Sequence, residues 1–213
     1  MNDSSNKRPA IFIDRDGTIS EEIGYVNHPS RYKVYPYAAD AVRAIHRAGY
    51  LAILVTNQAG VARGYFKEDL IAVIHNLLQA ELATGGEQLD AIYYCPHHPT
   101  TGAPPYRQAC DCRKPRPGLI MRAAREHDID LTGSWMIGDR ASDIELARHA
   151  HIKAAFVLSG YGRGEWEYSR HTFAHKPDIV AEDLLEAVNK IIETDSINQP
   201  TDLVTEPMIK SIE

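Results

Sequence analysis

Short apolar segments alternate with amphipathic segments along most of the chain. Five segments of four or five largely apolar residues are bounded by polar turns, which is typical of buried strands. In the segments between them, apolar residues recur every three or four positions, as on one face of a helix. The pattern predicts strands at residues 10–13, 51–55, 91–94, 134–137 and 154–157, and helices at residues 38–48, 67–83, 118–127, 142–150 and 182–192.

This alternation predicts an α/β fold whose βαβ units build a doubly wound, mainly parallel, Rossmann-like sheet. We expect a single domain over residues 1–193, because the length suits one α/β domain. Residues 95–117 and 160–177 lack periodicity and are expected to be irregular, and the polar residues 194–213 to form a flexible C-terminal tail. In such sheets ligands bind beyond the carboxyl ends of the strands, so functional residues are expected there.

The composition is that of an ordinary soluble globular protein, with 44% hydrophobic and 24% charged residues. The formal net charge of −6 argues against a nucleic-acid partner, because phosphate backbones are bound by basic surfaces. No apolar run is long enough to span a membrane, and residues 1–9 contain no apolar signal segment. We therefore expect a cytoplasmic monomer without a membrane partner.

The first predicted strand runs directly into Asp14 and Asp16. Residues two apart in an extended chain point the same way, so both carboxylates can face one site. Carboxylates that lie close together repel each other unless a cation neutralises one or one holds a proton. A magnesium ion would neutralise one carboxylate, and an acid/base role would require the other to hold a proton. The alternative is a simple polar turn, in which Asp-Gly is common.

The second and fourth predicted strands also end in polar residues. Thr56 and the small-residue loop at 57–60 offer a hydroxyl and backbone N–H groups that can surround phosphate oxygens. Asp139 stands where a second carboxylate ligand to magnesium would be needed. Asp143 either binds nearby or caps the helix that begins there, and the sequence supports both interpretations.

The loop at residues 95–112 contains all three cysteines of the chain and two histidines. Three thiols and one imidazole are the ligand set of a closed structural zinc site. Clustering in a Pro-rich loop with little core of its own favours zinc over the alternative of three buried thiols and a surface histidine. His98 is an alternative fourth ligand. The expected ligands are Cys95, His97, Cys110 and Cys112.

Two cations, Arg113 and Lys114, follow the last thiol directly. A metal site in this loop would hold both of them beside the strand ends. A lysine in that place can pair with a phosphoryl group and an aspartate. We therefore expect these residues to belong to the functional site rather than to a solvated basic surface.

Four motifs in this order resemble those of the haloacid dehalogenase superfamily of phosphotransferases. The motif residues are Asp14-x-Asp16-Gly17-Thr18, Thr56, Lys114, and Gly138-Asp139 with Asp143. The resemblance implies a haloacid dehalogenase-like fold and a phosphatase that uses Mg²⁺ and an aspartyl-phosphate intermediate.

Longer segments resemble the heptose-bisphosphate phosphatases of that superfamily. These enzymes hydrolyse the C7 phosphate of D-glycero-D-manno-heptose 1,7-bisphosphate in nucleotide-activated heptose biosynthesis, which supplies lipopolysaccharide. The resemblance implies a capless domain with a zinc-bound loop, Mg²⁺ and Zn²⁺ as cofactors, and a small phosphorylated sugar as substrate. The matching segments are Gly24-Tyr25-Val26, Thr56-Asn57-Gln58-x-Gly60-x-Ala62-Arg63-Gly64, and residues 93–99 and 110–115.

The same resemblance implies a role for each matching residue. Asp14 is expected to be the nucleophile and Asp16 the general acid/base. Thr56 and Lys114 are expected to bind the phosphoryl group. Ligands to Mg²⁺ are expected from Asp14, Asp16 (through its carbonyl) and Asp139, and substrate contacts from Glu22, Gly24, Tyr25, Asn57, Arg113 and Arg140.

Two alternatives remain open. A histidinol-phosphate phosphatase of histidine biosynthesis would share the motifs and a similar zinc loop, although residues 24–26 and 62–64 favour the heptose substrate. A non-catalytic zinc-bearing binding module would carry the same aspartates without turnover. Fine substrate preference is not implied by the resemblance, because Ala59 stands where Ser is usual, Arg140 where Lys is common, and residues 159–177 depart from the family pattern.

Overall fold

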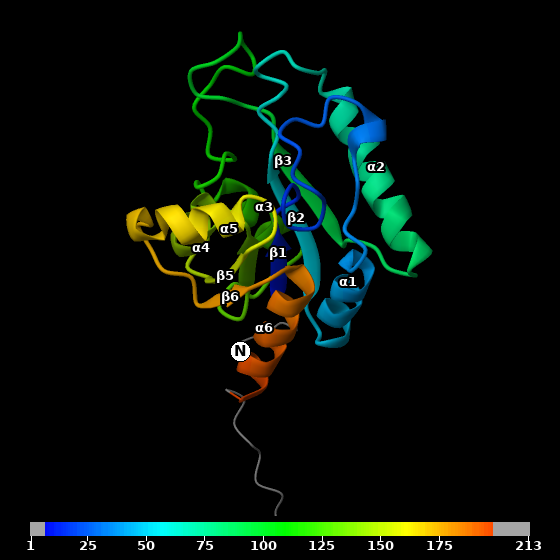
Figure 1. The fold of residues 1–213 in the computed structure, drawn as a ribbon, viewed down its shortest axis with the longest axis vertical. Coiled ribbons are helices and arrows are strands. Elements are labelled where there is room, and N and C mark those ends of the chain that lie inside the picture. Colours follow the sequence, from blue (N-terminus) through cyan, green and yellow to red (C-terminus); the bar gives the residue numbers. More distant parts are fainter. Residues whose placement is uncertain (1–6, 198–213) are drawn as a thin grey trace, which may run out of the picture.

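The computed structural model describes residues 7–197 of the chain. Six strands form one parallel sheet in the order β3-β2-β1-β4-β5-β6, with helices on both faces (Figure 1). The strands are β1 (Ala10–Ile13), β2 (Leu51–Asn57), β3 (Ala91–Cys95), β4 (Trp135–Gly138), β5 (Lys153–Val157) and β6 (Ile179–Ala181). The helices are α1 (Ala38–Arg47), α2 (Asp69–Thr84), α3 (Gly118–Glu126), α4 (Ala141–His149), α6 (Leu184–Ile197) and the short α5 (Gly162–Gly164).

The chain enters the sheet at its centre. β1 pairs with β2 on one side and with β4 on the other, so that Ile11 lies opposite both Ala52 and Trp135. From β1 the chain moves outward to β3, then crosses back to β4 and moves outward in the opposite direction to β6. The strand order therefore reverses between β1 and β4, and doubly wound sheets bind their ligands at this kind of point.

The strand side chains alternate between two buried layers. Ile11 and Ile13 pack in the core that α1, α2 and α6 share, whereas Ala10 and Phe12 pack in the core of α3 and α4. Figure 1 shows these two groups of helices on opposite sides of the sheet. Because both faces are covered, the central strands are continuous apolar runs, which is the pattern by which the sequence revealed them.

The structure confirms the predicted fold class and the five predicted strands, with small differences at their ends. β2 runs on to Asn57, because Thr56 and Asn57 still pair with Tyr94 and Cys95 of β3. Strand β6 was not predicted; it has three residues and lies at the edge of the sheet. A strand that short has too few positions for a recognisable hydrophobic pattern.

The prediction of irregular structure over residues 160–177 is wrong in its first half. Helix α5 is followed by a π-helical segment (Glu165–Ser169) and a 3₁₀ turn (Arg170–Thr172). Trp166 and Phe173 from this region pack against Phe156 of β5, with ring centroids 5.8 and 5.6 Å from that ring. Packing of aromatic rings on the core, rather than helical periodicity, holds the segment in place.

The last predicted helix, residues 182–192, is longer in the structure, because α6 continues to Ile197 and so includes residues 194–197 of the predicted tail. Asp195 in this last turn accepts hydrogen bonds from Tyr50, Trp135 and Lys153 in the sheet region. The remainder of the predicted tail, residues 198–213, lies outside the described residues. A flexible tail there stays a prediction.

Over residues 7–197 no second domain is inserted above the carboxyl edge of the sheet, in agreement with the predicted capless fold. The long loop between β3 and α3 rises at this edge instead (Figure 1, green). Among the same residues, no helix combines the length and the hydrophobicity needed to cross a bilayer.

Candidate active site

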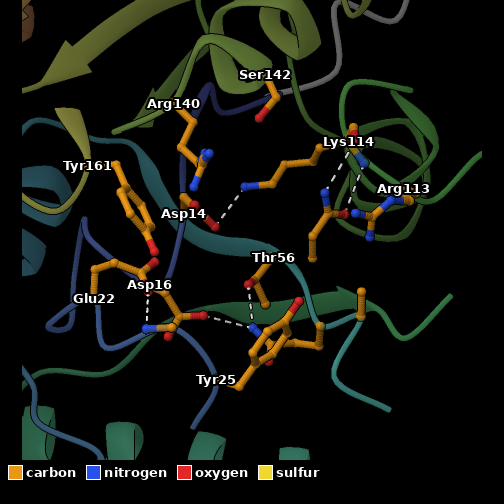
Figure 2. Close-up of a pocket in the computed structure, with 14 residues that line it drawn as sticks. Asp14, Asp16, Glu22, Tyr25, Thr56, Arg113, Lys114, Arg140, Ser142 and Tyr161 are labelled. Carbon is orange, nitrogen blue, oxygen red and sulfur yellow. Dashed lines mark hydrogen bonds and ion pairs between the residues drawn. The ribbon is translucent and has the colours of Figure 1, made fainter. Parts of the chain in front are cut away.

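The predicted catalytic residues converge at the carboxyl edge of the sheet. Asp14 follows β1, Thr56 is the last residue but one of β2, and Lys114 lies in the loop before α3. They line a cavity of about 410 Å³, a size suited to a small metabolite (Figure 2). The other residues predicted to act on or bind the substrate also line it: Asp16, Glu22, Gly24, Tyr25, Asn57, Arg113 and Arg140.

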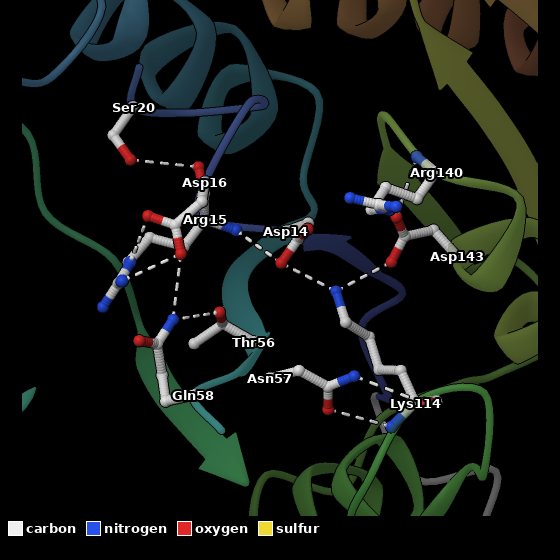
Figure 3. A network of polar contacts seen from close by, with 10 residues as sticks. All are labelled: Asp14, Arg15, Asp16, Ser20, Thr56, Asn57, Gln58, Lys114, Arg140 and Asp143. Carbon is white, nitrogen blue, oxygen red and sulfur yellow. Dashed lines mark hydrogen bonds and ion pairs between the residues drawn. The ribbon is translucent and has the colours of Figure 1, made fainter. Parts of the chain in front are cut away.

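Lys114 bridges two buried aspartates. Its Nζ lies 2.7 Å from Asp14 Oδ1 and 2.7 Å from Asp143 Oδ1 (Figure 3). Burial alone would lower the pKa of Lys114, but the two carboxylates raise it above its ordinary value. The lysine is therefore a fixed positive charge beside Asp14, where it can bind an oxygen of a phosphoryl group.

Asp14 and Asp139 are buried carboxyl groups with raised pKa values. Burial, reinforced by Asp143 and opposed by Lys114, raises the pKa of Asp14 to about 7. Burial and the nearby Asp14 raise the pKa of Asp139 to about 9. Asp14, Asp139 and Asp143 each place a carboxylate oxygen within 4.8 Å of the others. Three carboxyl groups around one lysine leave an excess of negative charge that a divalent cation would neutralise.

One carboxylate oxygen in particular fits a cation. Asp139 Oδ2 accepts a hydrogen bond from the backbone N–H of Tyr161 at 2.8 Å, while Oδ1 is buried without a hydrogen-bond partner. A buried carboxylate oxygen without a partner is costly unless a cation binds it. Carboxylate oxygens are also the ligands that Mg²⁺ prefers in proteins. The residues present therefore fit the predicted Mg²⁺, with Asp14 and Asp139 as ligands.

Asp143 serves both of the roles that the sequence left open. Its Oδ1 accepts from Lys114, and its Oδ2 accepts from the backbone N–H of Arg140 at 3.2 Å, at the N-terminus of α4. The same carboxylate thus caps the helix and orients the lysine. One group with two partners is fixed more firmly than either contact alone would fix it.

Two glycines allow loops to approach Asp139. Gly17 (φ +83°) and Gly160 (φ +56°) have left-handed backbone conformations, and a Cβ atom on either would collide with Asp139 Oδ2. Ser159 Oγ donates a hydrogen bond to the carbonyl of Gly17 at 2.6 Å. The loop after β5 is therefore packed directly on the loop after β1, and both enclose Asp139.

Asp16 is held by two side chains that the sequence analysis did not assign. Arg15 donates from Nε (3.1 Å) and Nη2 (2.8 Å) to the two carboxylate oxygens of Asp16. Gln58 Nε2 donates to Asp16 Oδ2 and to Thr56 Oγ1, both at 2.9 Å (Figure 3). These contacts orient the side chain of Asp16 in the wall of the cavity, so the Asp16 carboxylate is separate from the aspartate cluster.

Arg15 is itself buried, with 1% of its surface exposed. Burial alone would lower its pKa, but Asp16 raises it above the ordinary value. His75 of α2 lies 3.5 Å from Arg15 Nη1, and burial together with this guanidinium lowers the pKa of His75 to about 3. His75 is therefore neutral, and it does not compete with the Arg15 guanidinium for the Asp16 carboxylate.

The end of the long loop is attached to the sheet by Asn57. Its Nδ2 donates to the carbonyl of Lys114 at 3.2 Å, and its Oδ1 accepts from the backbone N–H of Lys114 at 3.0 Å. Arg113 Nη1 donates to the carbonyl of His97 at 3.2 Å. The two cations are thus held by the sheet and by the zinc loop. Contact of Asn57 and Arg113 with substrate stays a prediction.

The opposite wall of the cavity comes from the loop after β1 (Figure 2). Glu22 accepts a hydrogen bond from the backbone N–H of Gly24, and burial raises its pKa above the ordinary value. The ring of Tyr25 packs edge-on against that of Tyr65, with centroids 4.7 Å apart. Substrate bound here would lie between this wall and the cations, but the predicted contacts themselves stay untested.

The four predicted zinc ligands form one cluster. The Cys95 and Cys110 Sγ atoms lie 3.5 Å apart, those of Cys110 and Cys112 lie 3.1 Å apart, and His97 Nδ1 lies 3.3 Å from Cys112 Sγ. Hydrogen bonds, first from Cys95, lower the pKa of Cys112 to about 5, whereas the hydrogen bond with Cys112 raises the pKa of Cys95 and burial raises that of Cys110. Three Sγ atoms and one ring nitrogen gathered this closely are the ligand set of a closed structural site, so the cluster fits a zinc ion.

His98 lies outside this cluster. Its Nδ1 accepts hydrogen bonds from the backbone N–H groups of Thr100 (3.2 Å) and Thr101 (3.0 Å), and its Nε2 lies 3.1 Å from Arg63 Nη2. Both ring nitrogens are therefore engaged within the loop. Of the two candidate histidines, the geometry favours His97 as the zinc ligand.

The cavity also contains residues that the sequence analysis did not assign to the site, among them Gln58, Ser142 and Tyr161. Arg15 had a signal in the sequence, since it stands between two aspartates. Tyr161 had only its position shortly after a predicted strand, because it belongs to the segment with no family pattern.

The chain is similar to known proteins over most of its length. A family model described as HAD-hydrolase-like matches residues 111–187. Over 179 residues, the chain is 44% identical to D-glycero-beta-D-manno-heptose-1,7-bisphosphate 7-phosphatase of Pasteurella multocida, covering 81% of this chain and 97% of that protein. Over 188 residues, it is 41% identical to D-glycero-D-manno-heptose-1,7-bisphosphate 7-phosphatase of Thermosynechococcus vestitus, covering 86% of this chain and 95% of that protein.

Among solved structures, the chain is similar to a D,D-heptose 1,7-bisphosphate phosphatase from B. bronchiseptica, which was crystallised with magnesium and phosphate. The TM-score is 0.77 at 30% sequence identity, and the match covers 87% of this chain and 99% of that chain. The similarity therefore extends over nearly the whole length of each of these proteins.

Proposed function

The chain belongs to the heptose-1,7-bisphosphate 7-phosphatase family of HAD-like hydrolases, and we propose that it hydrolyses the C7 phosphate of D-glycero-D-manno-heptose 1,7-bisphosphate. The protein is an enzyme, a phosphatase of a small phosphorylated sugar. The observation that carries the proposed chemistry is the cluster of Asp14, Asp139 and Lys114 at the point where the strand order reverses. The proposed substrate is supported by the names of the relatives.

In the proposed reaction Asp14 is the nucleophile. One of its carboxylate oxygens attacks phosphorus and forms an aspartyl phosphate, while the bond between phosphorus and the C7 oxygen of the sugar breaks. Lys114, 2.7 Å from Asp14 Oδ1, is placed to bind an oxygen of the transferring group and to balance its charge. Thr56 and the N–H groups that follow it would bind the other oxygens.

Mg²⁺ would be held by Asp14, Asp139 and the carbonyl of Asp16. When bound, it supplies positive charge to the transferring phosphoryl group. The residues themselves support this assignment through the unpartnered Asp139 Oδ1 and the excess of carboxyl groups over cations.

Asp16 acts first as general acid and then as general base. It gives a proton to the departing C7 oxygen and later takes a proton from the water that attacks the aspartyl phosphate, which releases Asp14 and inorganic phosphate. Arg15 and Gln58 only donate hydrogen bonds to Asp16, so together they suit its ionised form. When Asp16 carries the proton, the proton occupies a carboxyl lone pair that these donors leave free.

A bisphosphorylated sugar brings a second anionic group. The Arg113 guanidinium, at the wall opposite Glu22, has the planar fork that binds phosphate through two N–H groups. Binding energy at the unreacting phosphate would orient the reacting one and raise kcat/KM for the natural substrate. The zinc loop would serve this role by holding Arg113 and Lys114 in place.

A substrate panel with matched variants tests the proposal. We expect kcat/KM for the heptose 1,7-bisphosphate to exceed that for histidinol phosphate strongly, with cleavage at C7. Arg113→Ala should remove most of this preference and spare hydrolysis of an aryl phosphate. Arg107→Ala, exposed on the same loop and outside the cavity lining, is the matched control.

The outcomes distinguish the alternatives. Equal rates on the two natural candidates, or a preference for histidinol phosphate, would overturn the heptose assignment and leave the phosphatase class standing. Absence of any hydrolysis with Mg²⁺ and intact zinc would favour a binding module. The relatives reported above are named for heptose bisphosphate, and neither alternative is favoured by them.

A further inference from the structure

The segment after β5 brings two side chains to Arg140 that the proposed mechanism does not use. Tyr161 lines the cavity, and Arg140 Cζ lies 4.5 Å from the centre of its ring (Figure 2). Glu165 Oε1 lies 3.2 Å from Arg140 Nη2. Tyr161 and Glu165 both belong to the segment that departs from the family pattern in sequence.

Glu165 fixes one edge of the guanidinium relative to α4. Its second oxygen, Oε2, accepts a hydrogen bond at 2.8 Å from the backbone N–H of Ala141, the first residue of that helix. A carboxylate is stabilised at a helix N-terminus whether or not a cation is nearby. The Glu165 side chain is 22% exposed. Arg140 therefore meets a partner whose position is set independently.

Tyr161 fixes the face of the same guanidinium. The face of an aromatic ring attracts a guanidinium, and 4.5 Å is within the range of this interaction. The backbone N–H of Tyr161 donates a hydrogen bond to Asp139 Oδ2, so the main chain that carries the ring is anchored to the aspartate cluster. An arginine held in place before binding loses less conformational freedom when a ligand arrives.

We propose that Tyr161 and Glu165 are positioning residues that hold the Arg140 guanidinium at the cavity mouth to bind, in addition to Arg113, the phosphate that is not transferred. This inference rests on the proposed function, because it requires a bisphosphorylated substrate. Arg140 lines the cavity, and 46% of its side chain is exposed. The cation paired with the nucleophile Asp14 is Lys114, so Arg140 is available for the other phosphate. A guanidinium has five N–H donors, and the contact with Glu165 leaves others free for a phosphate.

Two variants separate the contributions. Tyr161→Leu removes the ring face, and Glu165→Gln keeps an acceptor for the Ala141 N–H but removes the charge that faces Arg140. Each should raise KM for the heptose 1,7-bisphosphate by about 2- to 5-fold. Because the group bound does not react, kcat should change by less than about 2-fold. Tyr161→Phe keeps the ring and should restore the wild-type KM.

A double-mutant cycle shows whether the effect passes through Arg140. In an Arg140→Met background, Tyr161→Leu and Glu165→Gln should no longer change KM. Tyr168→Leu, 77% exposed in the same segment, is the control for the ring. Glu182→Gln, which removes one partner of the exposed pair with Arg163, is the control for the charge. Thermal unfolding of each variant checks that it is folded.

The results distinguish a failure of the positioning role from a failure of the proposed function on which it rests. A wild-type enzyme that does not prefer the bisphosphate over an aryl phosphate would overturn both. If the preference exists but the two variants behave like their controls, or lose the same factor with Arg140→Met present, the positioning role is wrong. A fall in kcat that is equal for the bisphosphate and the aryl phosphate would place Arg140 on the reacting group and also overturn it.

Discussion

Replacing Asp195 by alanine is expected to loosen α6 without altering the active site. The Asp195 carboxylate accepts hydrogen bonds from Tyr50 Oη (2.6 Å), Trp135 Nε1 (2.8 Å) and Lys153 Nζ (2.7 Å). These three residues lie at the amino ends of β2, β4 and β5, the edge of the sheet opposite the catalytic cavity. One side chain of the last helical turn therefore joins α6 to three parts of the sheet.

The structure sets the size of the effect. Trp135 is 1% exposed, so alanine at position 195 would leave its buried indole N–H without a partner. Lys153, with 39% of its side chain exposed, can turn to water instead. Leaving one buried donor unsatisfied and losing a charge-assisted bond should together lower the free energy of unfolding by about 2–4 kcal/mol. For a domain of this size that corresponds to a fall in Tm of roughly 5–15 °C.

The effect should depend on pH with a definite sign. Burial alone would raise the pKa of Asp195, but Lys153, Tyr50 and Trp135 bring it below its ordinary value. A carboxyl group whose pKa is lower in the folded protein stabilises the fold above its unfolded pKa, and this contribution is lost as the pH falls through its folded pKa. The difference in stability between wild type and Asp195→Ala is therefore full at neutral pH and shrinks in acid.

Urea and thermal unfolding of both proteins at neutral and acid pH provide the measurement. Asp195→Asn keeps an acceptor for the Trp135 N–H and loses the charge, so its stability should be intermediate. Glu193→Ala, exposed on the same helix, is the control. The reasoning fails if Asp195→Ala unfolds like wild type, if the difference persists unchanged in acid, or if kcat falls at temperatures where the variant is folded.

Three further outcomes are expected. Asp14→Asn should lower turnover by several orders of magnitude in a folded protein, and substantial residual activity of the pure variant would refute the aspartyl-phosphate mechanism. Metal analysis should find about one tightly bound zinc per chain, with a lower Tm after its removal, and protein that lacks zinc yet stays equally stable would contradict the zinc assignment. Gly160→Ala should displace Asp139 and lower both activity and stability, the latter by at least about 1 kcal/mol. Gly164→Ala, where a Cβ meets nothing within 4 Å, should be harmless in the same assays.

The residues at the ends of the central strands could be predicted from the sequence. Asp14, Thr56 and Asp139 could be placed because apolar runs mark buried strands, and parallel topology brings their carboxyl ends to one edge. The motifs also predicted the family, which relatives of more than 40% identity confirm. Clustered cysteines next to Lys114 predicted a compact loop for a similar reason, since the ligands are close together along the chain.

Tertiary structure alone decided which polar groups pair across the molecule. The partners of Asp195 come from three separate strand ends, so no local pattern could show that α6 extends past residue 193. Tyr161 and Glu165 reach Arg140 only because β5 lies beside β4 in the sheet. Hydrophobic periodicity indicates which face of an element is buried. A hydrogen bond or an ion pair between distant residues depends instead on how whole elements are placed relative to one another, which is set by packing as the chain folds.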